Sequence, residues 1–241
     1  MYEIKHLEET GSTNSELKRL ALSGAPSGTV LIADRQTAGR GRMGRTFFSP
    51  GGSGLYMSVL LRPISLADAG LLTTFTAVAV ARALSRLGVE TGIKWVNDLM
   101  INGRKVCGIL AEGGTYEGEP FAVIGIGVNL KKTAFPEELL PIAASLEEAV
   151  GFVPERDGLA IAILEELEAV DWQKAQSRAE LMAEYRRRSV TVGRQVRVLP
   201  HGGEAYEAFA ESIADDGALM IRTADGCPLK ISTGEVSIRP I

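Results

Sequence analysis

Residues 29–62 read TVLIADRQTAGRGRMGRTFFSPGGSGLYMSVLLR, and this stretch decides the fold that we expect. Its two ends, TVLIAD (29–34) and LYMSVLLR (55–62), are apolar, which predicts two buried strands. The loop Gly39–Arg45 between them has three glycines and three arginines. Glycine lets a backbone approach a ligand closely, and unpaired arginine is rarely fully buried. The loop therefore suits an anionic small molecule better than a protein core.

The spacing of Gly39, Gly41 and Gly44 formally matches a dinucleotide-binding fingerprint, which requires a helix directly after the loop. Residues 46–52, TFFSPGG, cannot continue a helix, and the chain has no Walker A sequence. A nucleotide would therefore bind in another geometry. A solvated hairpin loop is the alternative interpretation of this segment.

A second cluster, KWVND, occupies residues 94–98. Lys94 offers a point charge to a phosphate or carboxylate, and Asn97 and Asp98 add an amide and a carboxylate. A plain turn is the alternative, because Asn and Asp favour turns. Two glycines inside one apolar strand, Gly125 and Gly127, indicate close approach by a ligand or another chain, or else a bulge.

Composition limits the classes of protein that fit. With 241 residues, 45% of them hydrophobic, the chain can bury one good core and a small appendage. A net charge of −4 argues against electrostatic binding to nucleic acid or to an acidic membrane. Two distant cysteines and two histidines are too few for a disulfide framework or a zinc site. The absence of a signal core and of a long apolar run predicts a cytoplasmic protein.

The pattern of elements predicts an α+β fold in which helices back a mixed sheet. Further strands are expected at 2–8, 92–95, 99–101, 105–112 and 121–129, with a hairpin at Asn102-Gly103. Helices are expected from a capping box at Thr13–Glu16, from Ser65–Asp68 to Leu87, and mainly over 136–150 and 157–189. Five short strands follow, at 195–199, 207–213, 218–223, 228–232 and 235–239, which predicts a small β-barrel. The expected domains are residues 1–188 and 189–241.

The chain has no Ser-His-Asp pattern, no activated cysteine context and no convincing pair of acids. Chemistry that needs only charge neutralisation and positioning fits its arginines and lysine best. Adenylation is such a reaction: a carboxylate attacks the α-phosphate of ATP, and the enzyme holds together two anions that repel each other.

Six motifs in order resemble those of the biotin protein ligases, the biotin–[acetyl-CoA-carboxylase] ligases. They cover residues 10–130 and consist of Ser12-Thr13-Asn14, QTAGRGRMGR (36–45), FSP (48–50), KWVND (94–98), KVCGILAE (105–112) and GIGVNL (125–130). The resemblance implies a class II synthetase-like catalytic domain with an SH3-like C-terminal barrel. Phe47 stands where the family often has tryptophan, and Val96 where proline is common.

The resemblance also implies an activity in two steps. Biotin and MgATP would give biotinyl-5′-adenylate, and the biotinyl group would pass to one lysine of a biotin carboxyl carrier protein. By position, the implied biotin ligands are Ser12, Thr13, Asn14, Gln36, Arg40, Gly41, Arg42 and Lys94. The implied nucleotide ligands are Arg42, Phe47, Lys94 and Asn129. Lys94, Arg40 and Arg42 would be catalytic, and Asp98 is a candidate for binding metal or for handling the acceptor lysine, with no firm metal ligand.

Some members of the family carry an N-terminal DNA-binding domain that represses biotin genes. Because this chain starts close to Ser12, we expect it not to be a repressor. A homodimer through a sheet edge is a further expectation by resemblance. A lipoate or octanoate protein ligase and a non-catalytic biotin-binding module are the alternatives.

Overall fold

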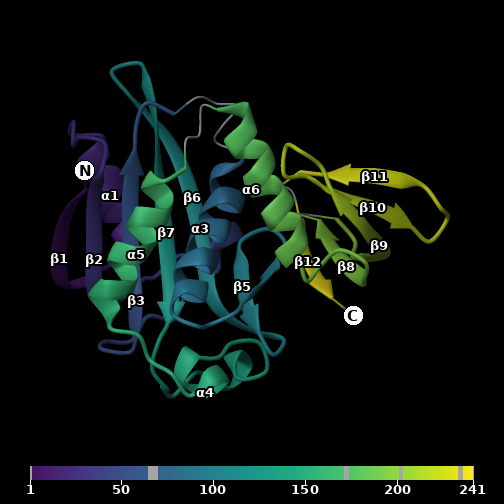
Figure 1. Ribbon diagram of the computed structural model, residues 1–241, viewed down its shortest axis with the longest axis horizontal. Helices are drawn as coiled ribbons and strands as arrows, with labels where there is room; N and C mark the ends of the chain where they lie inside the picture. The colour runs from purple at the N-terminus through teal and green to yellow at the C-terminus, as the bar shows by residue number, and fades with distance from the viewer. Residues whose placement is uncertain (1, 65–69, 171–173, 201–202, 233–235, 241) are drawn as a thin grey trace.

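A seven-stranded mixed sheet dominates the computed structural model, which describes residues 2–64, 70–170, 174–200, 203–232 and 236–240 (Figure 1). The strand order is β1-β2-β3-β7-β6-β5-β4, in which β1 and β2 are parallel and the other neighbours antiparallel. The strands are β1 (Glu3–Thr10), β2 (Thr29–Gln36), β3 (Gly54–Leu61), β4 (Gly92–Lys94), β5 (Asp98–Ile101), β6 (Arg104–Tyr116) and β7 (Glu119–Asn129). These bounds confirm the strands predicted for this part of the chain.

Helices cover the two faces of this sheet unequally. One face packs its apolar side chains, such as Leu55 and Ile124, into the main core with α3 (Leu72–Arg86), α5 (Arg156–Glu168) and α6 (Ala175–Arg188). On the other face, α1 (Thr13–Ala21) packs on a smaller cluster of Leu17, Ala21, Leu31, Leu60, Phe121 and Val123. Further along that second face, β3 carries Ser58 and β7 carries Gly125 and Gly127, and these small residues leave room for a site.

Two of the predicted helical segments differ from the structure. α1 has Ser12 as its N-cap without a side-chain hydrogen bond, so the predicted capping box at Thr13–Glu16 is wrong. The side chain of Thr13 instead donates to Gln36. The helix predicted mainly over 136–150 is reduced to η2 (Glu137–Leu139) and α4 (Leu146–Val150).

The reason for the shorter helices is a tertiary pairing. The backbone N–H of Lys105 donates to Ile142 O at 2.8 Å, and the N–H of Ala144 donates to Lys105 O at 2.9 Å. These bonds hold the chain extended where the sequence pattern favours helix. The helix start predicted at Ser65–Asp68 lies outside the described residues.

The C-terminal strands form a separate five-stranded antiparallel sheet in the order β11-β10-β9-β8-β12. They are β8 (Gln195–Pro200), β9 (Tyr206–Ile213), β10 (Leu219–Thr223), β11 (Pro228–Ile231) and β12 (Val236–Pro240), which confirms the five predicted strands and the α+β class. α6 lies between the two sheets (Figure 1). The division at residue 188 stays a prediction. Among the described residues, no helix is long and apolar enough to cross a membrane.

Candidate functional site

A cavity of about 1040 Å³ brings together every site residue that the sequence predicts. Segments that lie far apart in the sequence contribute to it, among them the start of α1, the loop between β2 and β3, the β4–β5 turn, β6 and the end of β7. The predicted residues on its walls are Ser12, Thr13, Asn14, Gln36, Arg40, Gly41, Arg42, Phe47, Lys94, Asp98 and Asn129.

Two glycines of β7 form part of the cavity floor. A Cβ on Gly125 would lie 2.3 Å from Oδ1 of Asn14, and a Cβ on Gly127 would lie 2.5 Å from the ring of Phe47. The register between β3 and β7 is regular here, so neither glycine marks a bulge. The close approach that the sequence indicated is made by two side chains of the chain itself, both of which line the cavity.

A polar network surrounds the N-terminus of α1. The backbone N–H and the hydroxyl of Thr13 both donate to Gln36 Oε1, at 2.9 and 3.1 Å. Ser58 Oγ lies 2.8 Å from Thr13 Oγ1 and 2.6 Å from Asn14 Oδ1. The Asn14 amide donates to Leu110 O. These bonds fix donors and acceptors in a buried wall, which is the arrangement that specific recognition of a polar small molecule needs.

Arg40, the first arginine of the glycine loop (Gly39–Arg45), forms an ion pair with a carboxylate of strand β6. Its guanidinium approaches both oxygens of Glu112 at 3.0 and 3.1 Å. The same carboxylate accepts from the Asn14 amide at 3.0 Å. Glu112 therefore links the glycine loop to the start of α1, and a bidentate pair of this kind fixes the direction of the guanidinium.

Arg42, the second cation of the loop, donates to Asn97 Oδ1 at 3.3 Å. Asn97 is held in turn, because its amide donates to Ile109 O at 2.9 Å. Burial lowers the pKa of the Arg42 guanidinium, and the nearby carboxylate of Asp98 raises it. Arginine keeps its charge across the physiological range, so the cavity holds a partly desolvated cation.

Two lysines flank Asp98. Lys94 is its register partner across β4 and β5. Lys105 Nζ lies 2.6 Å from Asp98 Oδ1 and 5.6 Å from the centre of the Phe47 ring. A register shift in the β5–β6 pairing lies between Leu99 and Met100, next to the position opposite Lys105. The two lysines thus add positive charge to the cavity on either side of the Asp98 carboxylate.

The end of the cavity near β7 is aromatic and amide-lined. The rings of Phe47 and Tyr56 meet edge to face with 6.4 Å between their centroids. The Asn129 amide donates to Ala144 O at 3.1 Å, which orients its side chain.

Comparison with known proteins decides the family. Residues 7–129 match the Biotin/lipoate A/B protein ligase family, and residues 191–239 match the Biotin protein ligase C terminal domain. The biotin–[acetyl-CoA-carboxylase] ligase of Mycobacterium tuberculosis is 39% identical over 237 residues, which cover 95% of this chain and 86% of that protein. The chain belongs to the biotin protein ligase family.

Other members of the family agree with this assignment. The bifunctional ligase/repressor of Bacillus subtilis is 36% identical over 94% of this chain and 71% of its own length. The structure of the biotin protein ligase from Aquifex aeolicus in complex with biotin and ATP superposes with a TM-score of 0.82 at 28% identity, with all of both chains covered. The protein is thus a ligase enzyme.

Three residues that hold the site in place were not among the site residues predicted from the sequence. Ser58 binds the start of α1, Glu112 orients Arg40, and Lys105 pairs with Asp98. Of the three, only Glu112 had a signal in the sequence. It follows the apolar stretch KVCGILA, and a carboxylate in that place could face either the site or solvent. Ser58 and Lys105 are recognisable only once the strand register is known.

The surroundings of Cys107 and Asp98 limit what each of these two groups can do in the unliganded protein. Burial raises the pKa of the Cys107 thiol to about 12, so it stays protonated. In the described ranges, no group of three or more His, Cys, Asp or Glu side chains could hold a metal ion. Asp98, the predicted metal candidate, is already paired with Lys105.

Proposed function

We propose that this chain activates biotin with ATP and then biotinylates a lysine of a biotin carboxyl carrier protein. In the first step a biotin carboxylate oxygen attacks the α-phosphorus of ATP, and the bond to the β-phosphate breaks to release pyrophosphate. In the second step the acceptor amine attacks the carbonyl carbon of the adenylate, loses a proton and expels AMP. Membership of the family supports both steps.

The single observation that carries the proposal is the convergence of positive charge on one cavity. Arg40, Arg42, Lys94 and Lys105 all line it, although they come from the glycine loop and from two strands. A carboxylate and a triphosphate repel each other, and cations fixed in a partly desolvated site offset that repulsion where charge develops in the transition state.

The roles proposed for the predicted residues follow their positions. Ser12, Thr13, Asn14 and Gln36 would bind the polar head of biotin beside the start of α1. Arg40, Gly41 and Arg42 would cover the carboxylate and the α-phosphate. Phe47 and Asn129 would contact the adenine.

Lys105 joins Lys94 as a candidate for neutralising the reacting anions. The ammonium of Lys105 lies over the Phe47 ring and beside Asp98, which holds it in the cavity. Replacement of Lys105 by Met should therefore lower kcat, as should replacement of Lys94 by Met. A kcat unchanged in the Lys105 variant would assign the charge to Lys94 alone.

Mg²⁺ fits the site as a companion of the nucleotide. Mg²⁺ in such sites is held by one or two carboxylates and by the substrate phosphates. Asp98 and the triphosphate would be its partners here, and displacement of the Lys105 ammonium from Asp98 would then free that lysine for the phosphates.

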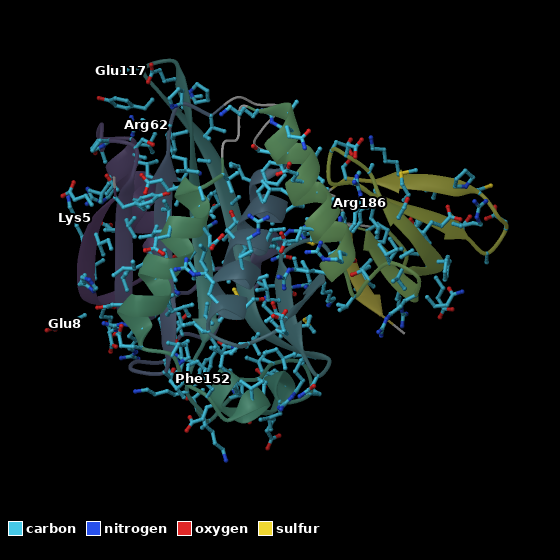
Figure 2. The ribbon with its side chains drawn as sticks, viewed as in Figure 1. Lys5, Glu8, Arg62, Glu117, Phe152 and Arg186 are labelled. Atoms are coloured by element: carbon cyan, nitrogen blue, oxygen red, sulfur yellow. The ribbon has the colours of Figure 1, made fainter. Side chains whose placement is uncertain are left out.

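Two expectations about partners remain part of the proposal. A homodimer would use β1, the edge strand of the large sheet, whose outer side carries Lys5 and Glu8 (Figure 2). Repressor activity is not proposed, because neither the cavity nor the mildly acidic chain suggests a DNA-binding surface.

Pyrophosphate release tests the proposal. The purified chain should release pyrophosphate from MgATP only when biotin is present, and biotinyl-5′-adenylate should remain bound. Lipoate should not replace biotin at the same concentration. Equal rates with lipoate would favour the lipoate ligase, and tight biotin binding without pyrophosphate would favour the non-catalytic module.

A further inference from the structure

The β4–β5 turn, residues 95–97, is held from both sides. On the cavity side, Asn97 accepts from Arg42 at 3.3 Å, and the following residue, Asp98, pairs with Lys105 at 2.6 Å. The turn thus fixes two of the four cations that the proposed chemistry uses. Whatever sets the position of this turn also sets the position of those two charges.

The same turn is also bonded to α6 and to the C-terminal sheet. Trp95 is 3% exposed, and its indole N–H donates to Gly217 O at 2.9 Å, in the turn between β9 and β10. The backbone N–H of Trp95 donates to Thr191 Oγ1 at 2.9 Å. The fully buried Tyr185 of α6 donates its hydroxyl to Val96 O at 3.1 Å.

Tyr185 stands directly behind the charged groups of the site. Burial raises the pKa of its hydroxyl, an effect that the Arg42 charge opposes and the Asp98 charge increases. The hydroxyl is therefore neutral at physiological pH and donates its hydrogen bond to Val96 O. Val96 O is a buried acceptor that loses this partner if the hydroxyl is removed.

We infer that Tyr185, Trp95 and Thr191 are positioning residues, which place Arg42 and Lys105 by fixing the turn that carries Asn97 and Asp98. The inference rests on the proposed adenylation. It assigns a catalytic purpose to the contact between the two sheets: α6 and the C-terminal sheet determine the geometry of the cations through the β4–β5 turn.

The experiment compares Tyr185→Phe with Arg186→Met. Both residues lie on α6, and Arg186 is labelled in Figure 2. Arg186 donates to Ile213 O at 2.7 Å, so it also joins α6 to the C-terminal sheet, but it makes no bond to the turn. Arg186→Met therefore serves as the matched control for a general weakening of that contact.

Tyr185→Phe should lower kcat for biotin-dependent pyrophosphate release by about 10- to 100-fold, because small misplacements of catalytic groups cost this much. The Kd for biotin should change by a smaller factor than kcat, since the polar network at α1 is untouched and only the Arg42 end of the proposed biotin site is affected. Arg186→Met should keep the wild-type kcat. In an Asn97→Ala background, Tyr185→Phe should lower kcat by only about twofold or less. Both changes disrupt the same connection, which runs from Tyr185 through the β4–β5 turn to Arg42.

Equal kcat values for Tyr185→Phe and the wild type would overturn the inference, as would an equal fall in both α6 variants. If a thermal unfolding measurement shows that Tyr185→Phe is not folded, Thr191→Val replaces it. That change removes only the acceptor for the Trp95 backbone N–H, and it should give the same pattern of kcat and Kd. Failure of the proposed function is distinguishable, since the wild-type chain itself would then release no pyrophosphate.

Discussion

Gly125→Ala is the substitution whose cost the structure allows to be worked out most directly. The new Cβ would lie 2.3 Å from Asn14 Oδ1 and 2.9 Å from Asn14 Cγ, distances that no packed pair of atoms tolerates. Asn14 must therefore move away from Ser58, Leu110 and Glu112, to which it is bonded at 2.6, 3.2 and 3.0 Å.

The magnitude follows from those three bonds. Each is worth about 0.5–1.5 kcal/mol net, and Gly→Ala in a strand otherwise stabilises by about 0.5–1 kcal/mol. The free energy of unfolding should therefore fall by about 0.5–4 kcal/mol, with a central value of about 2 kcal/mol. The affinity for biotin should fall with it, because Asn14 is part of the proposed biotin site.

Gly113→Ala on the neighbouring strand β6 is the matched control. Its Cβ would meet nothing closer than Phe121 O at 3.7 Å, so it should be neutral or slightly stabilising. Urea unfolding and calorimetric biotin titration measure both effects. In an Asn14→Ala background the cost of Gly125→Ala should drop by at least about 1 kcal/mol, since the clash is gone. A Gly125→Ala variant as stable as Gly113→Ala would refute the packing argument.

Three further predictions use other parts of the molecule. Arg42→Gly should release the biotinyl-adenylate and biotinylate lysines of bystander proteins, which intact mass of an added non-acceptor protein detects; retention of the adenylate would contradict this role. Thiol titration should label Cys227, which is exposed, in the native protein, and Cys107 only after unfolding, because Cys107 is buried and burial raises its pKa to about 12; labelling of both thiols in the native protein would oppose this. Burial raises the pKa of Glu184, but bonds from Arg82 and Arg188 more than offset this and lower it below 4.5. A depressed pKa contributes stability above the unfolded value and loses it as pH falls through the folded one. Glu184→Gln should therefore destabilise at neutral pH, and the difference should shrink as the pH falls through the lowered pKa of Glu184 in the folded protein; a difference independent of pH would refute the assignment.

Much of the fold could be predicted from local sequence patterns. The runs TVLIAD and LYMSVLLR predict strands, and Asn102-Gly103 predicts a hairpin turn, because strand and turn propensities depend on only a few neighbouring residues. The predicted site residues also gather on one cavity, because each motif lies at a strand end or a helix start on the same face of the sheet.

The parts that sequence could not give depend on contacts between distant segments. Residues 142–144 pair with Lys105 instead of continuing a helix. Lys105 reaches Asp98 beside a register shift in the β5–β6 pairing. The bond from Trp95 to Gly217 joins residues 122 positions apart. No local propensity encodes such contacts, because they exist only once the sheets have formed.

Transfer of biotin to an acceptor lysine tests the central claim most directly. The pure chain would be incubated with biotin, MgATP and a biotin carboxyl carrier domain, and the acceptor followed by intact mass. We predict the addition of one biotinyl group, which disappears without ATP, with lipoate in place of biotin, and when the acceptor lysine is replaced by arginine. An acceptor of unchanged mass, beside one that a known biotin protein ligase biotinylates under the same conditions, would contradict the account.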